Sequence, residues 1–279
     1  MREVTETTPP DLQAFSTARI LKESWEISTR YFGALVMPVV VIILACALPV
    51  FIFPGKGAEV MNNVLTAIFS PIAFMGLQHS VLRLKSQGKE PTFSSTFSFG
   101  HEYWGRGFRL GWILGLYTFL VVIGAMIVAA ILFVPGTMLI DKHAVPGAIL
   151  VGLGGLLFLT ALAWFGARSC LAYSAMADGL TSATRAFELG WEMTKPHVKK
   201  TLSLGFALTG ILVIIVFLFV LAAVFMSALE LEEDISVALL VFGGVLAYLF
   251  GLAYTHICLC LTYQALKPAP KEDNQLPAD

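Results

Sequence analysis

The sequence predicts an all-α, polytopic membrane protein with six transmembrane helices, on three observations. Of the 279 residues, 57% are apolar and 13% are charged, whereas a soluble domain has roughly 45–50% apolar and about 25% charged residues. The apolar residues gather in six long runs, and a bilayer core of about 30 Å is crossed by roughly 20 helical residues. The basic residues fall almost entirely on one side of these runs.

Six runs reach the length of a transmembrane helix. They are residues 33–53, 60–82, 110–134, 148–173, 201–226 and 236–266. The second run is the most polar, because it contains Asn62, Asn63, Gln78 and His79. A re-entrant or interfacial segment is therefore the alternative to a full span at 60–82.

The distribution of basic residues predicts the orientation. Of the 18 Lys and Arg residues, only Lys56 and Lys142 fall on one side of the predicted spans. The short loops on that side are acidic instead, with residues such as Glu59 and Asp141. Because basic loops stay on the cytoplasmic side of a membrane, we expect both termini in the cytoplasm.

The predicted membrane domain, residues 17–267, divides into three repeat units between polar tails at 1–16 and 268–279. The units are 17–84, 92–173 and 181–267, each an interfacial helix followed by a transmembrane hairpin. Arg19 and Trp25 have the same spacing as Arg185 and Trp191. The second unit begins at Thr92 after a proline, and the third has Thr181 as its expected helix cap. With two spans per unit the repeat is parallel, which predicts a pseudo-threefold bundle.

The first interfacial helix is expected to be amphipathic. At about 100° per residue, its apolar residues share one arc with two serines, and its charged residues fill the other. Glu26 and Arg30 form the expected i,i+4 ion pair on the charged arc. Trp25, and likewise Trp104 and Trp191 in the other two units, are predicted to be anchors at headgroup depth.

Two segments carry a family resemblance. Residues 84–97 have the sequence LKSQGKEPTFSSTF, and residues 186–195 have AFELGWEMTK before an apolar run. They resemble bacterial six-helix proteins related to the glycerophosphoryl diester phosphodiesterase membrane domain. The phosphodiesterase chemistry of such fused proteins belongs to a separate soluble domain, and no segment here is long or polar enough to be one. The resemblance therefore implies a multi-pass protein of the inner (plasma) membrane without catalysis.

Ionisable and polar residues inside apolar helices are the default candidates for function. Gln78, His79, Arg168 and His256 fall at similar depths near the ends of the second, fourth and sixth runs. If the repeat is threefold, they converge into a basic pocket suited to a phosphate headgroup or an anionic metabolite. The alternative is that each one snorkels to the interface or donates to a nearby carbonyl.

Neither a metal site nor a catalytic set is predicted. His256 and Cys260 are four residues apart on one helical face, but Cys258 points about 160° away, which favours polar packing over a metal. The glycines near 111–115, 152–155 and 243–244 lie in apolar runs. Close helix packing explains them better than phosphate binding. We expect no cofactor and no nucleic-acid partner.

Three functions remain open after these observations. The first is a non-enzymatic membrane protein that binds lipids, a partner protein or a second copy of itself through its cytoplasmic amphipathic helices. The second is a transporter or lipid translocator that recognises its substrate at Gln78, His79, Arg168 and His256. The third, an intramembrane enzyme, has the least support because no acid and base pair falls at a common depth.

Overall fold

The computed structural model describes residues 16–52, 55–140, 143–179, 182–228 and 233–267, so both predicted tails lie almost entirely outside it. Within these ranges the chain is all-α, without strands. The helices are α1 (Thr17–Arg30), α2 (Phe32–Ile52), α3 (Lys56–Gln87), α4 (Phe93–Glu102), α5 (Trp104–Ile140), α6 (Ala144–Ser169), α7 (Ala172–Ala177), α8 (Ala183–Thr194), α9 (Val198–Ala228) and α10 (Glu233–Leu266), with a 3-10 turn, η2 (Lys195–His197), before α9.

Long helices occupy all six apolar runs, as predicted, and pair into the hairpins α2–α3, α5–α6 and α9–α10. Within the described ranges, five helical segments are long and apolar enough to cross a membrane. A sixth is obtained if α1 and α2, which are bent by 77° at Tyr31, together count as one span. These lengths and compositions are those of a multi-pass membrane protein.

The fourth run has a short break at Cys170 and Leu171, but residues 144–177 together form one helical segment that is long and apolar enough to cross a membrane. α6 ends at Ser169, and the chain turns before α7 begins at Ala172. Helix α8 packs against this turn, where a Cβ on Gly190 would lie 2.9 Å from the backbone nitrogen of Ala172. The hydroxyl of Thr194 donates to the Arg168 carbonyl at 2.9 Å, which satisfies an acceptor at the end of α6.

A hydroxyl side chain caps each of the short helices α1, α4 and α8. Ser16 accepts from the Arg19 amide at 3.5 Å, and Thr92 forms a capping box with Ser95. The cap of α8 is Ser182, not the predicted Thr181, which lies outside the described residues. Such caps satisfy amide groups that have no partner inside the helix.

Helix α1 buries one side against protein. Its buried residues include Ile20 and Ile27, and this face packs on α10, where Tyr254 donates to the Leu21 carbonyl at 2.9 Å. Arg30 pairs with Glu90 at 3.5 Å instead of with Glu26 as expected. Protein therefore covers much of the apolar face of α1.

Each of the short helices α1, α4 and α8 packs against the second segment of a hairpin, and in the second hairpin this segment comprises α6 and α7. α4 contacts α3, α8 contacts α7, and α1 contacts α10. The contact of α4 with α3 is the closest: a Cβ on Gly76 would overlap the Thr96 carbonyl, and one on Gly100 would overlap the Ile72 carbonyl. Two glycines thus let the two backbones touch directly.

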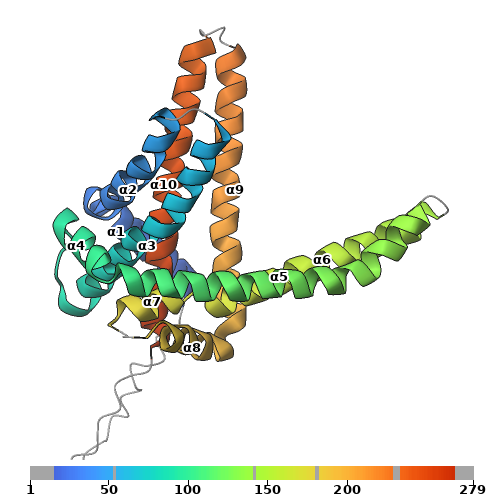
Figure 1. Ribbon diagram of the computed structural model, residues 1–279, viewed down its shortest axis with the longest axis horizontal. Coiled ribbons are helices and arrows are strands. Elements are labelled where there is room, and N and C mark those ends of the chain that lie inside the picture. The colour runs from blue at the N-terminus through green and yellow to red at the C-terminus, as the bar shows by residue number, and fades with distance from the viewer. Residues whose placement is uncertain (1–15, 53–54, 141–142, 180–181, 229–232, 268–279) are drawn as a thin grey trace, which may run out of the picture.

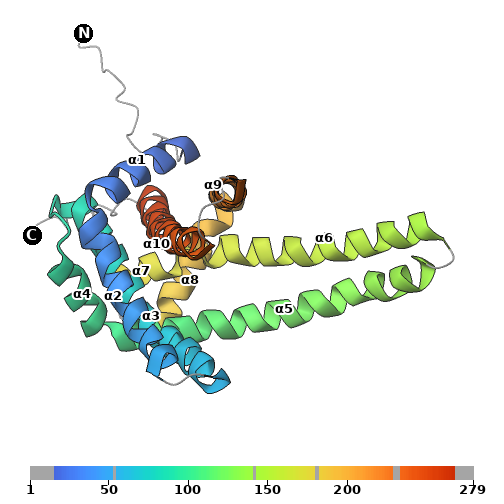
Figure 2. The same cartoon turned by 90° about the horizontal axis from the view of Figure 1, so that it is seen from above.

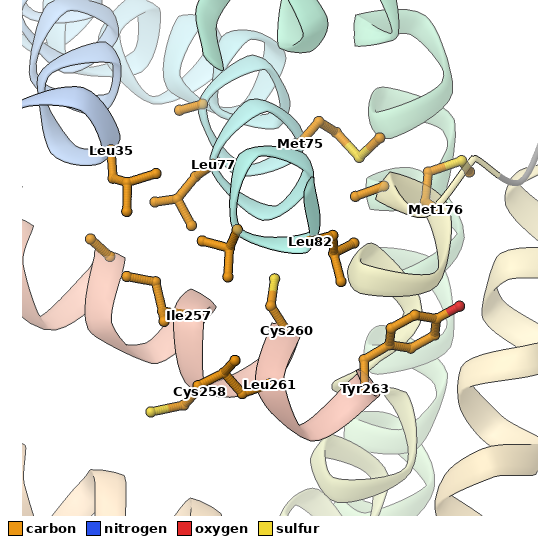
Figure 3. Close-up of a cluster of buried hydrophobic side chains, with 14 of the residues drawn as sticks. Leu35, Met75, Leu77, Leu82, Met176, Ile257, Cys258, Cys260, Leu261 and Tyr263 are labelled. Carbon is orange, nitrogen blue, oxygen red and sulfur yellow. The ribbon is translucent and has the colours of Figure 1, made fainter. Parts of the chain in front are cut away.

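The core lies at the base of the molecule, the region where α3, α7 and α10 meet. Figure 3 shows Leu77 and Leu82 of α3, Met176 of α7, and Ile257 and Cys260 of α10 converging there. All five side chains are almost completely buried.

From this base the hairpins diverge. The α5–α6 hairpin extends to one side, across the direction of α9 and α10, as Figures 1 and 2 show. Its outward residues are mostly large and apolar, and on α5 only Gly107, Leu110, Ala129 and Gly136 are buried. The expected closed pseudo-threefold bundle is therefore not the arrangement seen here. Apolar side chains that project outward over most of a helix are suited to contact with lipid.

Substitution of the contact glycines tests the approach of α4 to α3. We expect Gly76→Ala and Gly100→Ala each to destabilise the protein by about 1–3 kcal/mol, because an added methyl forces the backbones apart. The measurement is the thermal unfolding midpoint in detergent. Gly124→Ala is the matched control, since a Cβ there has no neighbour within 4 Å. Equal midpoints for all three variants would contradict the close contact.

Candidate functional site

Helices α3, α7 and α10 contribute to a buried set of polar side chains at the base. This central polar cluster consists of Gln78 from α3, Ser174 from α7, and His256 and Cys260 from α10. Gln78 Nε2 lies 2.7 Å from His256 Nδ1, and Ser174 Oγ donates to Gln78 Oε1 at 3.0 Å. Gln78, Ser174 and Cys260 are completely buried. One amide therefore joins the three helices.

The bonding pattern in the central polar cluster assigns the proton positions. Because the Gln78 amide nitrogen can only donate, His256 Nδ1 accepts and the ring proton is placed on Nε2. Phe74 stacks on the His256 ring with centroids 4.3 Å apart, and Cys260 Sγ lies 3.6 Å from the Gln78 carbonyl oxygen. The cluster's polar groups therefore bond mainly to one another, as in a structural network.

His79 follows Gln78 in the sequence but faces another site. Its Nδ1 donates to the Ala177 carbonyl at 3.0 Å, and its ring stacks on Phe99 at a centroid distance of 3.4 Å. It lines a cavity of about 300 Å³, the basal pocket, where α3 ends and α4 begins. The pocket is lined by His79, Ser80, Arg83, Lys89, Glu90, Pro91, Thr92 and Ser95.

The basal pocket has an excess of positive charge. Arg83 and Lys89 supply two cations, and Arg83 Nε donates only a long bond of 3.4 Å to Gln87. The one carboxylate in the lining, Glu90, is already engaged by Arg30 and by the Tyr31 hydroxyl, at 3.5 and 3.1 Å. The charge left for a ligand is therefore positive, which suits an anion such as a phosphate.

Arg168 lies apart from the other predicted residues. It is 4% exposed, and its guanidinium lies 4.4 Å from the Trp191 ring centroid. Among the described residues, its Nε and Nη1 have no hydrogen-bond partner. Of the four predicted ligand residues, the structure joins Gln78 to His256 and places His79 and Arg168 in separate surroundings. Ser174, six residues after Arg168, bonds to Gln78 in the central polar cluster.

The three predicted tryptophan anchors differ in their surroundings. Trp25 on α1 is 56% exposed and touches Phe250 by its ring edge, which agrees with an interfacial position. Trp104 is half-buried and donates from Nε1 to the Ile68 carbonyl at 2.6 Å. Trp191 is half-buried against Arg168. Trp104 therefore contacts α3 and Trp191 contacts α6, and their role as headgroup anchors stays a prediction.

Among the described residues, no group of three or more His, Cys, Asp and Glu side chains is placed to hold a metal ion. The four cysteines are unpaired thiols. Figure 3 shows Cys258 and Cys260 projecting in different directions from α10, as their spacing predicts. Cys260 contributes to the central polar cluster, and Cys258 does not.

The Gln78 amide can be tested by an apolar side chain of similar length. We expect Gln78→Met to destabilise the protein by about 1–3 kcal/mol, because Ser174 and His256 each lose a buried hydrogen-bond partner. The measurement is the thermal unfolding midpoint in detergent. Gln87→Met on the exposed end of the same helix is the control and should leave it unchanged. A stable Gln78 variant would show that the cluster does not hold the helices together.

Comparison of the chain with protein-family models, with curated proteins and with solved structures finds no match. The resemblance of residues 84–97 and 186–195 to bacterial six-helix membrane proteins consequently stays a prediction. No residue role can be carried over from a relative. The function has to be inferred from the basal pocket, the central polar cluster and the distribution of charge.

Proposed function

We propose that the chain is a non-enzymatic, multi-pass protein of the inner membrane that binds anionic lipid headgroups at its cytoplasmic base. The observation that carries this proposal is the basal pocket. It combines two cations, a carboxylate paired with Arg30, and hydroxyl groups at the point where a long apolar helix ends. Lipid phosphates lie at this depth of a bilayer, and clustered basic side chains on the cytoplasmic side attract them.

The proposal includes six spans in three repeat units with both termini in the cytoplasm. Each unit has a capped short helix followed by a hairpin. Each short helix contacts the hairpin of another unit: α4 contacts the first hairpin, α8 the second, and α1 the third. The three contacts therefore form a closed cycle. This closed order supports a threefold origin, although the α5–α6 hairpin must swing toward the direction of α9 and α10 when all three cross one bilayer.

The positive-inside rule supports the orientation. The basic side of the predicted spans includes Arg83 and Lys89 in the basal pocket, and Arg19, Lys22 and Arg30 on α1. Of the Lys and Arg residues, the opposite side has only Lys56 and Lys142. A lipid site at the basic end would therefore face the cytoplasmic leaflet, which carries the anionic lipids.

The central polar cluster favours a non-enzymatic role. Its side chains bond to one another; Gln78, Ser174 and Cys260 are completely buried, and His256 is half-buried. A catalytic site needs a nucleophile, base or acid that can reach a substrate, and the buried members of this cluster cannot do so. The alternative role of the base is to bind a partner protein or a second copy of the chain.

Transport of an anion is the second candidate function, and Arg168 is the observation that favours it. A buried guanidinium without hydrogen-bond partners is costly, and an anion would satisfy it. Arg168→Ala separates the two functions in a lipid-binding assay. Loss of anion retention with normal stability supports an anion-binding site at Arg168, which transport requires, whereas lost stability with unchanged lipid binding gives Arg168 a structural role against Trp191.

Topology can be measured with reporter fusions. We expect reporters placed after Lys89 and Lys195 to lie in the cytoplasm, and those after Lys56 and Lys142 on the opposite face, because the basic residues flank the former positions. Protease protection of the fused domain is the readout. If the fusion after Lys56 is also cytoplasmic, the first hairpin does not span and the three-unit proposal fails.

The basal pocket can be tested by removing its charge. We expect Arg83→Gln with Lys89→Gln to weaken binding of phosphatidylglycerol by roughly tenfold to thirtyfold, since a basic residue near a membrane contributes about 1 kcal/mol. The measurement is the lipid concentration that gives half of the maximal thermal stabilisation in detergent.

Lys56→Gln, at the opposite end of α3, is the matched control for the pocket variant. It should bind phosphatidylglycerol as the unchanged protein does. If the control and the pocket variant lose affinity equally, the effect comes from overall charge and the pocket is not a lipid site.

A further inference from the structure

One ring nitrogen in the basal pocket, His79 Nε2, has no hydrogen-bond partner among the described residues. The other nitrogen, Nδ1, lies 3.0 Å from the Ala177 carbonyl oxygen. Since a carbonyl oxygen only accepts, Nδ1 carries the proton of this bond. Phe99 covers one face of the ring. Because His79 lines the basal pocket, Nε2 is the ring nitrogen left to bond a ligand there.

The proton on Nδ1 determines what Nε2 can bind. In a neutral imidazole with one protonated nitrogen, the other nitrogen is an acceptor. The hydroxyl groups at the start of α4 do not supply a hydrogen to it, because Thr92 Oγ1 donates to Ser95 Oγ, and Ser95 Oγ donates to the Thr92 carbonyl oxygen. When a ligand displaces water from the pocket, the hydrogen for Nε2 therefore has to come with the ligand.

The two cations of the lining retain donors for a ligand. Arg83 uses its Nε for the long bond to Gln87, and its two Nη groups have no partner among the described residues. Within the same residues Lys89 makes no ion pair. A guanidinium binds a phosphate through two parallel bonds, and an ammonium binds it as a point charge. The pocket therefore offers two positive charges to one ligand.

The carboxylates near the pocket do not cancel these two charges. Glu90 is paired with Arg30. Outside the lining, Asp178 is paired with Lys267, and Glu102 is exposed at the end of α4, where salt and water screen its charge. A ligand with one negative charge leaves one pocket cation unpaired, whereas a ligand with two negative charges pairs with both.

Phosphomonoesters and phosphodiesters differ in charge and in their protons. A phosphomonoester carries about −1.5 to −2 charges near neutral pH, because its second pKa is about 6. It therefore has a proton that it can share with an acceptor. A phosphodiester has a single negative charge and no such proton. The pocket volume of about 300 Å³ is at the small end of ligand sites, which suits a phosphate without a further substituent.

We propose that the basal pocket is selective for a phosphomonoester over a phosphodiester, with the phosphate between Arg83 and Lys89 and a proton shared with His79 Nε2. This selectivity rests on the proposed binding of anionic headgroups at the same pocket. The shared proton lies between a phosphate oxygen and Nε2, so the bond forms whichever of the two atoms holds it. Phosphatidic acid and a soluble phosphomonoester both present this group.

A single methyl group tests the selectivity on the unchanged full chain. Phosphatidylmethanol is phosphatidic acid with one methyl on the phosphate, which removes the proton and one charge. The measurement is the lipid concentration that gives half of the maximal thermal stabilisation in detergent at pH 7. We expect this concentration to be roughly tenfold to a hundredfold lower for phosphatidic acid, because the monoester gains a charge-assisted hydrogen bond.

Methyl phosphate and dimethyl phosphate repeat the comparison without an acyl chain. If methyl phosphate stabilises the protein at the same concentration as phosphatidic acid, the monoester chemistry is supported and the ligand is a soluble phosphate. If the selectivity appears only between the two lipids, the same chemistry is supported and the ligand is a lipid headgroup.

His79→Asn tests the role of Nε2. An Asn amide nitrogen takes nearly the position of Nδ1, so this variant keeps a donor to Ala177 and removes Nε2. It also loses the stack on Phe99, and Phe99→Leu is therefore the matched control, since it loses the same stack and keeps Nε2. We expect His79→Asn to reduce the selectivity for phosphatidic acid over phosphatidylmethanol about tenfold, and Phe99→Leu to leave it unchanged.

Three results would overturn the selectivity. Equal stabilisation by phosphatidic acid and phosphatidylmethanol would exclude it without any variant. Unchanged selectivity in His79→Asn, or an equal loss in Phe99→Leu, would show that Nε2 does not produce it. If Arg83→Gln with Lys89→Gln still weakens binding of both lipids in these cases, the basal pocket binds headgroups and only the selectivity fails. If this double variant binds both lipids as the unchanged chain does, the proposed function fails as well.

Discussion

Direct backbone contact between α4 and α3 is the constraint on which much of the structure depends. Gly76 and Gly100 remove the two side chains that would keep the helices apart. α4 then lies against the last turns of α3, and the α3–α4 connection closes one side of the basal pocket. Ser80 on α3 and Thr96 on α4 bond to each other at 2.8 Å, so the same contact is both close and polar. The position of Lys89 relative to Arg83 follows from it.

The molecule combines two kinds of environment. At the base, side chains such as Leu77 and Ile257 are completely covered by protein, and the interior is packed as in a soluble core. In the α5–α6 hairpin, large apolar side chains such as Ile131 and Met138 face outward and depend on lipid for their solvation. The boundary between these environments runs through the ends of the long helices, where Arg83 of α3 and Arg109 of α5 lie.

The polar side chains with a structural role differ from the candidates for ligand binding in whether they have hydrogen-bond partners within the protein. Gln78, Ser174 and His256 bond to one another, as side chains in a structural network do. Arg168 and the basal cations are not satisfied in this way. Trp191 covers the Arg168 guanidinium, but a ring face replaces only part of the hydrogen bonding that water supplies. Binding of anions is therefore best sought at these cations.

The sequence by itself determined the all-α class, the six apolar runs, the start of the second short helix near Thr92 and the strong asymmetry of charge. These features depend on local composition and spacing, which a chain carries without its tertiary contacts. It also suggested that Gln78 and His256 lie at one depth. Only the tertiary structure decided that they bond to each other and that Ser174, not Arg168, completes the cluster. Two helices pack together where their backbones can approach closely. Here that approach is made possible by glycines far apart in the sequence, Gly76, Gly100 and Gly190.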